Sequence, residues 1–269
     1  MPGVSGALVD REQLARRGRR RNHGQGYVRA LRRRHAERRP PPQGGPLTEH
    51  DAITIALPDG RAVSGLWTPA EAAPRWCVVY APGAGAKLSD GFGLALAEAL
   101  PPQGIGVLRF QFPYTEEGRR LPDRLPVLEA TWTAAIRFAR DRGGRLVAGG
   151  RSMGGRIASQ VVGKGEAVDG LALFAYPLHP PGRPDQRRDA HLPRIAVPTL
   201  FCSGTNDAFA TPEELRAAAA LIPRVTVHLL RQADHGFHVA KRTGRTRQEV
   251  WDEAIAALVT WLATIPEHS

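Results

Sequence analysis

The stretch Arg145-Leu-Val-Ala-Gly-Gly-Arg-Ser152-Met-Gly-Gly-Arg156 decides how the rest of the chain is interpreted. Its first four residues are typical of a strand, and Met153–Val162 is predicted to be a helix. Gly150, Ser152 and Gly154 lie at the turn between them, with the Gly-x-Ser-x-Gly spacing of a nucleophile elbow. Such a turn strains the serine backbone and leaves room only for glycine two residues before and after it. We predict that Ser152 is a nucleophile; the alternative is a hydroxyl that caps the helix.

On both sides of this elbow, from about residue 47, short apolar runs alternate with stretches of helical periodicity. Strands are predicted at Ile53–Leu57, Val63–Trp67, Cys77–Tyr80, Gly106–Phe110, Arg145–Ala148, Leu171–Ala175, Pro198–Cys202 and Val225–Leu230. Helices are predicted at Phe92–Leu100, Leu125–Arg140, Met153–Val162, Pro212–Leu221 and Arg247–Ile265. The order predicts an α/β fold with one eight-stranded, mostly parallel sheet, in which the leading hairpin supplies antiparallel edge strands and helices cover both faces. The Pro-rich segment Tyr176–Pro193 is too short for a cap domain.

A serine needs a base and an orienting acid, which follow it along the chain in this kind of fold. Asp207 comes after the strand that ends at Cys202, and His235 comes after the last strand. We predict that these two residues complete a triad with Ser152, because ligand sites gather at the carboxyl ends of parallel strands. Asp234 competes as the acid, although its place beside the histidine favours a role in the turn. His238 competes as the base, and Asp207 has an alternative role in an Asx-turn or helix cap.

An oxyanion hole should accompany the triad. Its expected donors are the backbone N–H groups of Met153, directly after the nucleophile, and Ala84, in the Gly-rich loop after the third strand. Arg151 beside the nucleophile is a candidate for an anionic substrate group, or else a partner in a structural ion pair with Asp207 or another acid. Tyr114 is a candidate for the pocket wall or for aromatic packing. His179 and His191 are expected to line the entrance or to be solvated.

The net charge of +11 is concentrated at one end of the chain. Residues 1–46 hold twelve Arg and three acidic residues, whereas residues 47–269 hold 25 basic and 23 acidic residues. This excludes a uniformly basic nucleic-acid-binding protein. We expect residues 1–46 to be a disordered basic arm with a Pro/Gly linker, and residues 47–269 to be the folded domain. The arm is a candidate contact for nucleic acid or an acidic partner. Alternatively, the arm is a spurious extension from a wrongly chosen start codon. The whole chain holds 34 Arg and three Lys, a ratio that fits a GC-rich coding sequence, in which unselected translation also yields Arg, Gly and Pro.

Several other classes of protein are not expected. No apolar run reaches the roughly 18 residues of a membrane span, and the N-terminus has no apolar segment of a secretory signal. Cys77 and Cys202 are the only cysteines, on strands too far apart for a disulfide, so a cytoplasmic location is expected. His235-x-x-His238 has no evident third ligand, and we expect no metal or other cofactor.

Six segments resemble the α/β-hydrolase superfamily over residues 47–265. They are Ala81-Pro-Gly-Ala-Gly-Ala86, Arg109-Phe-Gln-Phe-Pro-Tyr114, Gly150-Arg-Ser-Met-Gly-Gly-Arg156, Tyr176-Pro-Leu-His-Pro-Pro181, Gly204-Thr-Asn-Asp207 and Asp234-His-Gly-Phe237. They are most similar to the dienelactone-hydrolase-like branch, and within it to the predicted hydrolases grouped with testis-expressed protein thirty and the third subunit of the NSL histone-acetyltransferase complex. Dienelactone hydrolase itself uses Cys as the nucleophile, where this chain has Ser152, so its substrate is not assumed.

Residues and resemblance together imply a serine hydrolase, carboxylesterase-like, that cleaves an ester or related acyl bond of a small molecule through Ser152, His235 and Asp207. The alternative is a non-catalytic interaction module of the same fold that uses the basic arm, because some relatives serve as subunits of complexes.

Overall fold

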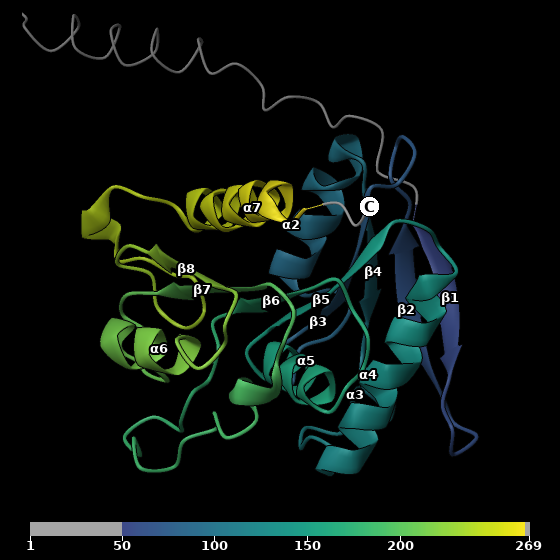
Figure 1. The fold of residues 1–269 in the computed structure, drawn as a ribbon, viewed down its shortest axis with the longest axis horizontal. Helices are drawn as coiled ribbons and strands as arrows, with labels where there is room; N and C mark the ends of the chain where they lie inside the picture. Colours follow the sequence, from purple (N-terminus) through teal and green to yellow (C-terminus); the bar gives the residue numbers. More distant parts are fainter. Residues whose placement is uncertain (1–49, 267–269) are drawn as a thin grey trace, which may run out of the picture. The chain divides into compact units, whose positions relative to one another are not determined.

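A computed structural model describes residues 50–266. The predictions for residues 1–46 therefore lie outside the described residues. Eight strands form one sheet in the order β1-β2-β4-β3-β5-β6-β7-β8, in which β1, β2 and β4 pair antiparallel and all later neighbours pair parallel (Figure 1). The predicted α/β-hydrolase architecture, with its eight strands, is confirmed.

The strands are β1 (Asp51–Ala56), β2 (Ala62–Thr68), β3 (Trp76–Ala81), β4 (Ile105–Phe110), β5 (Arg145–Arg151), β6 (Gly170–Phe174), β7 (Thr199–Gly204) and β8 (Val225–Leu230). The helices are α2 (Gly91–Ala99), α3 (Pro113–Glu116), α4 (Leu125–Arg140), α5 (Met153–Gly163), α6 (Pro212–Ala219) and α7 (Arg247–Thr264). Three 3-10 turns, η1 (Pro101–Gln103), η2 (Leu192–Arg194) and η3 (Lys241–Thr243), complete the described elements.

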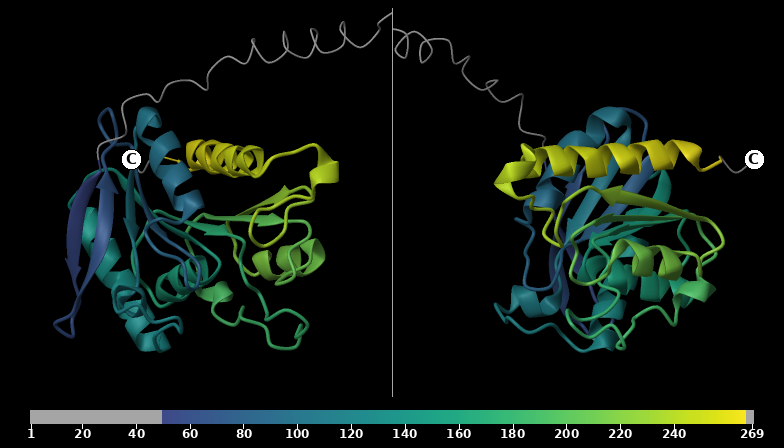
Figure 2. Two further views of the ribbon diagram at one scale, coloured as in Figure 1. Left: turned by 180° about the vertical axis from the view of Figure 1, so that it is seen from behind. Right: turned by 90° about the vertical axis from the view of Figure 1, so that its left-hand side faces the viewer.

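Helices cover both faces of the sheet, as predicted. In Figures 1 and 2, α2 and α7 lie on one side, and α4, α5 and α6 lie on the other. The two apolar cores match this division: Phe92 and Leu258 belong to one cluster, whereas Trp132 and Leu215 belong to the other. The central strands β3, β4 and β6 are buried along their whole length, because each faces a helical layer on both sides.

The main differences from the sequence prediction concern element ends. β5 continues three residues beyond the predicted Ala148, to Arg151, so the strand runs directly into the elbow. The four-residue helix α3 was not predicted, because a single turn that starts at Pro113 carries no periodicity. Between β6 and β7 the chain forms turns and η2 only, so this segment builds no cap domain. Within residues 50–266, none of the helices combines the length and the apolar character needed to span a bilayer.

Candidate active site

The turn between β5 and α5 holds Ser152 in a strained conformation. Its φ of 53° and ψ of −120° are unusual for a residue with a side chain. The backbone N–H of Ser152 donates to the carbonyl of Phe174 on β6, 2.8 Å away, which fixes the turn to the sheet. Its hydroxyl makes no capping hydrogen bond to α5, so the alternative of a helix cap is wrong.

The predicted glycines allow this turn to form. A Cβ on Gly154 would stand 2.1 Å from the carbonyl oxygen of Ala81, and a Cβ on Gly150 would stand 2.6 Å from the same oxygen. Both distances are shorter than any tolerated contact, and the obstacle is backbone that cannot rotate away. Trp132 on α4 adds a clamp from outside, because its Nε1–H donates to the carbonyl of Gly154 at 3.0 Å.

Ser152, His235 and Asp207 form one hydrogen-bonded chain. Ser152 Oγ lies 2.8 Å from His235 Nε2, and His235 Nδ1 lies 2.9 Å and 3.0 Å from the two carboxylate oxygens of Asp207. The Asp207 side chain is fully buried, whereas about a fifth of the His235 side chain is exposed. With Nδ1 protonated and donating to the carboxylate, Nε2 is free to accept the serine proton. The structure thus brings together the three predicted residues.

The competing assignments are resolved by contacts in the same loops. Asp234 Oδ1 accepts the N–H groups of Gly236 and His238, both at 2.8 Å, so this carboxylate shapes the turn that carries the histidine. His238 is exposed and pairs with Asp234 at 3.3 Å rather than with the serine. Asp207 does form the Asx-type contact that was the alternative, to the N–H of Phe209 at 2.8 Å, and holds His235 as well.

Two backbone N–H groups beside Ser152 suit an oxyanion hole. Met153 is the first residue of α5, and Ala84 lies in the loop after β3; both line the same cavity as the serine. Within residues 50–266, neither N–H has a hydrogen-bond acceptor. Two unengaged donors next to a nucleophile are what a developing oxyanion requires, and Met153 adds the positive end of a helix dipole.

Tyr114 does not line the cavity, so its prediction as a pocket residue is wrong. The residue is fully buried, and its hydroxyl accepts the N–H of Gly85 at 2.9 Å. Its own N–H donates to Asp123 at 2.8 Å. The aromatic ring packs near Phe112, with 6.3 Å between the ring centroids. Tyr114 therefore supports the loop that carries Ala84 from behind.

Arg151 lines the cavity but is also engaged in an ion pair. Its Nη2 lies 3.3 Å from Asp90 Oδ1, an acid other than the Asp207 considered above. Asp90 also accepts the hydroxyl of Tyr80 at 2.6 Å and caps α2 through the N–H of Gly93. The charge of Arg151 is thus compensated by a carboxylate that is itself held in place.

The cavity at Ser152 measures about 430 Å³ and opens at the carboxyl ends of the parallel strands. Its walls contain residues that sequence reasoning did not single out: Pro122, Arg156, Pro177, Arg188 and Phe209. The ring of Phe209 stacks on that of His235, with 3.9 Å between centroids. The place of Arg156 in the cavity wall could have been predicted from the sequence, because a residue four positions after Ser152 on a helix lies on the same face. Phe209 and Arg188 sit in loops and gave no such signal.

His179 and His191 neither line this cavity nor stand free in solvent, contrary to both expectations. His179 is buried and contacts Glu214, 3.2 Å from Nε2 to Oε2. His191 Nε2 lies 2.7 Å from the hydroxyl of buried Ser159 on α5. Both histidines fasten the segment between β6 and β7 to neighbouring helices. Within residues 50–266, no cluster of three or more potential ligands suits a metal ion.

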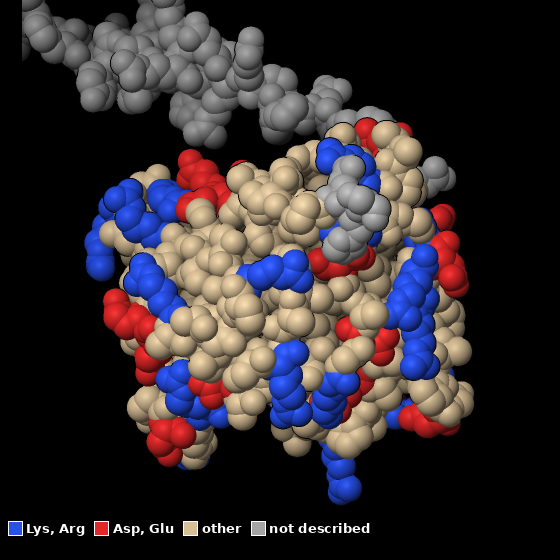
Figure 3. Space-filling view, viewed as in Figure 1, with Lys and Arg blue, Asp and Glu red and all other residues tan. Residues whose placement is uncertain are grey.

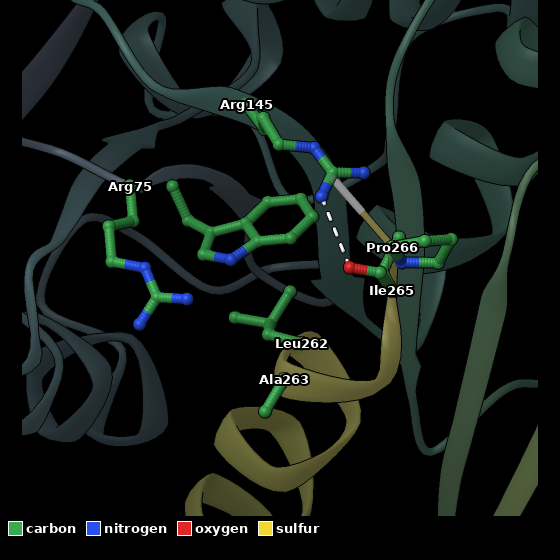
Figure 4. Close-up of a pocket in the computed structure, with 7 residues that line it drawn as sticks. Arg75, Arg145, Leu262, Ala263, Ile265 and Pro266 are labelled. Carbon is green, nitrogen blue, oxygen red and sulfur yellow. Dashed lines mark hydrogen bonds between the residues drawn. The ribbon is translucent and has the colours of Figure 1, made fainter. Parts of the chain in front are cut away.

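A second cavity of about 470 Å³ lies at the opposite ends of the strands (Figure 4). Arg145, at the start of β5, stacks its guanidinium over Trp76 at 4.2 Å and donates to the carbonyl of Ile265 at 3.2 Å. These contacts tie the amino ends of β3 and β5 to the end of α7. The lining of this cavity, as far as the described residues 50–266 form it, contains no serine, histidine or carboxylate, so we assign it a structural role.

Comparison with known proteins agrees with this geometry. Residues 74–263 match the family described as the alpha/beta hydrolase domain, which covers more than half of the chain. The chain belongs to the α/β hydrolase domain family. The match includes the elbow and the loops that carry Asp207 and His235.

Solved structures of other α/β hydrolases share the fold. One is an alpha-beta serine hydrolase homologue from Coxiella burnetii, 20% identical, with TM-score 0.63, which covers 80% of this chain and 100% of its own. Another is dienelactone hydrolase from Anabaena variabilis, 18% identical, with TM-score 0.65 and coverage of 82% and 100%. A third is an α/β serine hydrolase without lid from Xanthomonas campestris, 20% identical, with TM-score 0.61 and coverage of 84% and 100%. At these identities the likeness concerns the fold.

Proposed function

We propose that this α/β hydrolase is a carboxylesterase-like serine hydrolase that cleaves an ester or related acyl bond of a small molecule. The observation that carries the proposal is the continuous hydrogen bonding from Ser152 Oγ to His235 and from His235 to the buried Asp207. A strained serine backbone and the two unengaged N–H groups of Ala84 and Met153 support the same reading. Two of the structurally similar proteins are described as serine hydrolases, which also supports the proposal.

In the proposed mechanism, His235 Nε2 takes the proton of Ser152 as Oγ attacks the acyl carbon. The carbonyl oxygen becomes an oxyanion that accepts hydrogen bonds from Ala84 and Met153. The imidazolium is stabilised by the Asp207 carboxylate and returns its proton to the leaving oxygen or nitrogen, which departs and leaves an acyl-enzyme. Water, deprotonated by His235, then attacks the acyl carbon and releases a carboxylic acid and the free serine.

The narrower resemblance, to the hydrolases grouped with testis-expressed protein thirty, remains part of this proposal. A cytoplasmic location is also part of the proposal. It is supported by Cys77 and Cys202, which are buried and form no disulfide. The alternative of an interaction module for nucleic acid gains no support from the described residues, whose basic and acidic side chains are interspersed on the face in Figure 3.

Turnover of p-nitrophenyl acetate and butyrate tests the proposal. We expect hydrolysis by the wild-type protein, and a loss of about 10²–10⁴-fold in kcat for His235→Gln and Asp207→Asn. His238→Gln is a matched control that should retain wild-type turnover, since His238 is exposed, pairs with Asp234 and does not line the cavity. Equal turnover by wild type and His235→Gln, with both proteins folded, would contradict the proposed mechanism.

A further inference from the structure

Three arginines line the cavity at Ser152, and two of them have no carboxylate partner. Arg151 is paired with Asp90 at 3.3 Å. Arg156 and Arg188 form no ion pair with any described carboxylate. The nearby acids form ion pairs with other cations: Asp189 holds Arg187 at 2.6 Å, and Glu129 holds Lys164 at 2.6 Å through Oε2, although the charge of Glu129 also acts on Arg156. The cavity wall therefore carries two guanidiniums that form no ion pair with a described carboxylate.

Both guanidiniums are mounted on fixed backbone. Arg156 lies one helical turn after Ser152 on α5, and its N–H donates to the Ser152 carbonyl at 3.0 Å. Two hydrogen bonds hold the backbone of Arg188. Its N–H donates to the Leu178 carbonyl at 2.8 Å, and its carbonyl accepts the Tyr176 hydroxyl at 2.7 Å. The side-chain hydrogen bonds of the two guanidiniums to other described residues are long, 3.4 Å from Arg156 Nη1 to Gln160 Oε1 and 3.5 Å from Arg188 Nη1 to the Pro177 carbonyl. Most of their donors remain available to a ligand.

Two positively charged guanidiniums in the partly buried wall of the cavity repel each other, and this repulsion costs free energy unless an anion binds to them. Burial, followed by the positive charge of Arg188, lowers the pKa of Arg156. An oxyanion placed between the two side chains would remove this repulsion and accept hydrogen bonds from both. The neighbouring His191 adds no further positive charge, because burial lowers its pKa to about 4 and the ring is neutral at pH 7.

We propose that Arg156 and Arg188 form a carboxylate-binding subsite, so that the preferred substrates are esters whose acyl part carries a free carboxylate. This inference deepens the proposed function and rests on it for the chemistry at Ser152. A carboxylate fits because each of its two oxygens can face one planar guanidinium, while the rest of the 430 Å³ cavity holds the acyl chain. The bond that breaks remains the acyl–oxygen bond, and the carboxylate only orients the substrate.

The kinetic test compares half methyl esters of succinate, glutarate and adipate with the corresponding dimethyl esters. For the best chain length, we expect kcat/KM of the half ester to exceed that of the dimethyl ester about tenfold or more, per ester group. Arg156→Gln and Arg188→Gln should each reduce this preference about 10- to 100-fold. Arg183→Gln, an exposed arginine of the same segment that does not line the cavity, should leave it unchanged. No preference at any chain length, or a preference that survives both substitutions, would overturn the inference.

A binding test separates this inference from the proposed function. Calorimetric titration of the Ser152→Ala protein with glutarate needs no turnover, and the affinity should fall about tenfold or more when Arg188→Gln is added. Ester hydrolysis that depends on His235, without half-ester preference or glutarate binding, would overturn the subsite and leave the hydrolase proposal standing. Arginine-dependent glutarate binding without any ester hydrolysis would overturn the hydrolase proposal and leave the subsite standing. Tighter binding of inorganic phosphate than of glutarate would overturn the choice of a carboxylate.

Discussion

The hydroxyl of Tyr114 accepts a hydrogen bond from the N–H of Gly85, 2.9 Å away, and so fixes the residue next to Ala84. The proposed oxyanion donor therefore depends on a tyrosine that never touches the cavity. One further hydrogen bond, from the N–H of Ala86 to the carbonyl of Gly83 at 3.1 Å, closes the same turn, in which Gly85 adopts a φ of 75°. The Tyr114 hydroxyl is in this sense a positioning group for the proposed oxyanion hole.

Tyr114→Phe should lower kcat for p-nitrophenyl esters about tenfold, with little change in KM. The expected loss is smaller than the about 10²–10³-fold effect of removing an oxyanion donor itself, because the N–H of Ala84 remains and only its placement loosens. Steady-state kinetics give the split between kcat and KM, and thermal unfolding gives the stability of the variant. A rise in KM at constant kcat would mean that Tyr114 supports substrate binding instead.

Gly154→Ala should prevent the elbow from forming. The new Cβ would stand 2.1 Å from the Ala81 carbonyl oxygen, and neither a Cβ nor a backbone oxygen can rotate away by a change of side-chain rotamer. We expect a loss of about 4 kcal/mol or more in the free energy of unfolding, or no folded protein at all. Gly60→Ala is the matched control: its φ is 84° but nothing lies within 4 Å of the added atom, so a loss of only about 1 kcal/mol is expected. Chemical denaturation of both variants measures the difference, and equal losses would contradict the argument.

These positions also indicate what the sequence could and could not predict. Ser152, Asp207 and His235 were predictable, because the elbow glycines mark the first and strand ends mark the other two. The wall of the cavity was not, since Phe209 and Arg188 reach it through loops whose paths depend on tertiary contacts. Tyr114 was misplaced for a related reason: it follows the carboxyl end of β4, but the single turn of α3 directs it into the core.

The stability of the protein should depend on His191 in acid. Burial, then the charges of Arg156 and Arg194, lowers the pKa of His191 to about 4, below its ordinary value of 6.5. Between these values the unfolded chain binds more protons at this residue than the folded one, so the free energy of unfolding falls as the pH falls through this window. We expect this residue to contribute roughly 2 kcal/mol of that fall, a figure reduced because the ring is partly exposed.

Denaturation of wild type and His191→Asn at several pH values between 7 and 4 isolates this contribution. Other titrating groups are common to both proteins, so the difference between the two curves reports the histidine. His191→Asn should be less stable at pH 7, because it loses the ring that contacts Ser159 at 2.7 Å, and should lose less on acidification. Parallel curves would show that the ring does not titrate differently on folding.

Neither cysteine should react in the folded protein. Burial raises the pKa of Cys77 to about 12 and raises that of Cys202 as well, and both side chains are inaccessible. Ellman's reagent should therefore detect no thiol under native conditions and two in 6 M guanidinium. Treatment of the folded protein with iodoacetamide should leave ester hydrolysis intact. Loss of activity on such treatment would point to a thiol nucleophile instead of Ser152.

The central claim is that the Ser152 hydroxyl is the nucleophile, and its covalent capture tests this most directly. A fluorophosphonate should form one adduct on the folded wild-type protein, and mass spectrometry of the digested protein should locate it on Ser152. Ser152→Ala protein should form none, while Ser159→Ala, which removes a buried serine hydroxyl from the same helix, should still be labelled. Labelling of folded Ser152→Ala to the wild-type extent, or no labelling of folded wild type, would contradict the account.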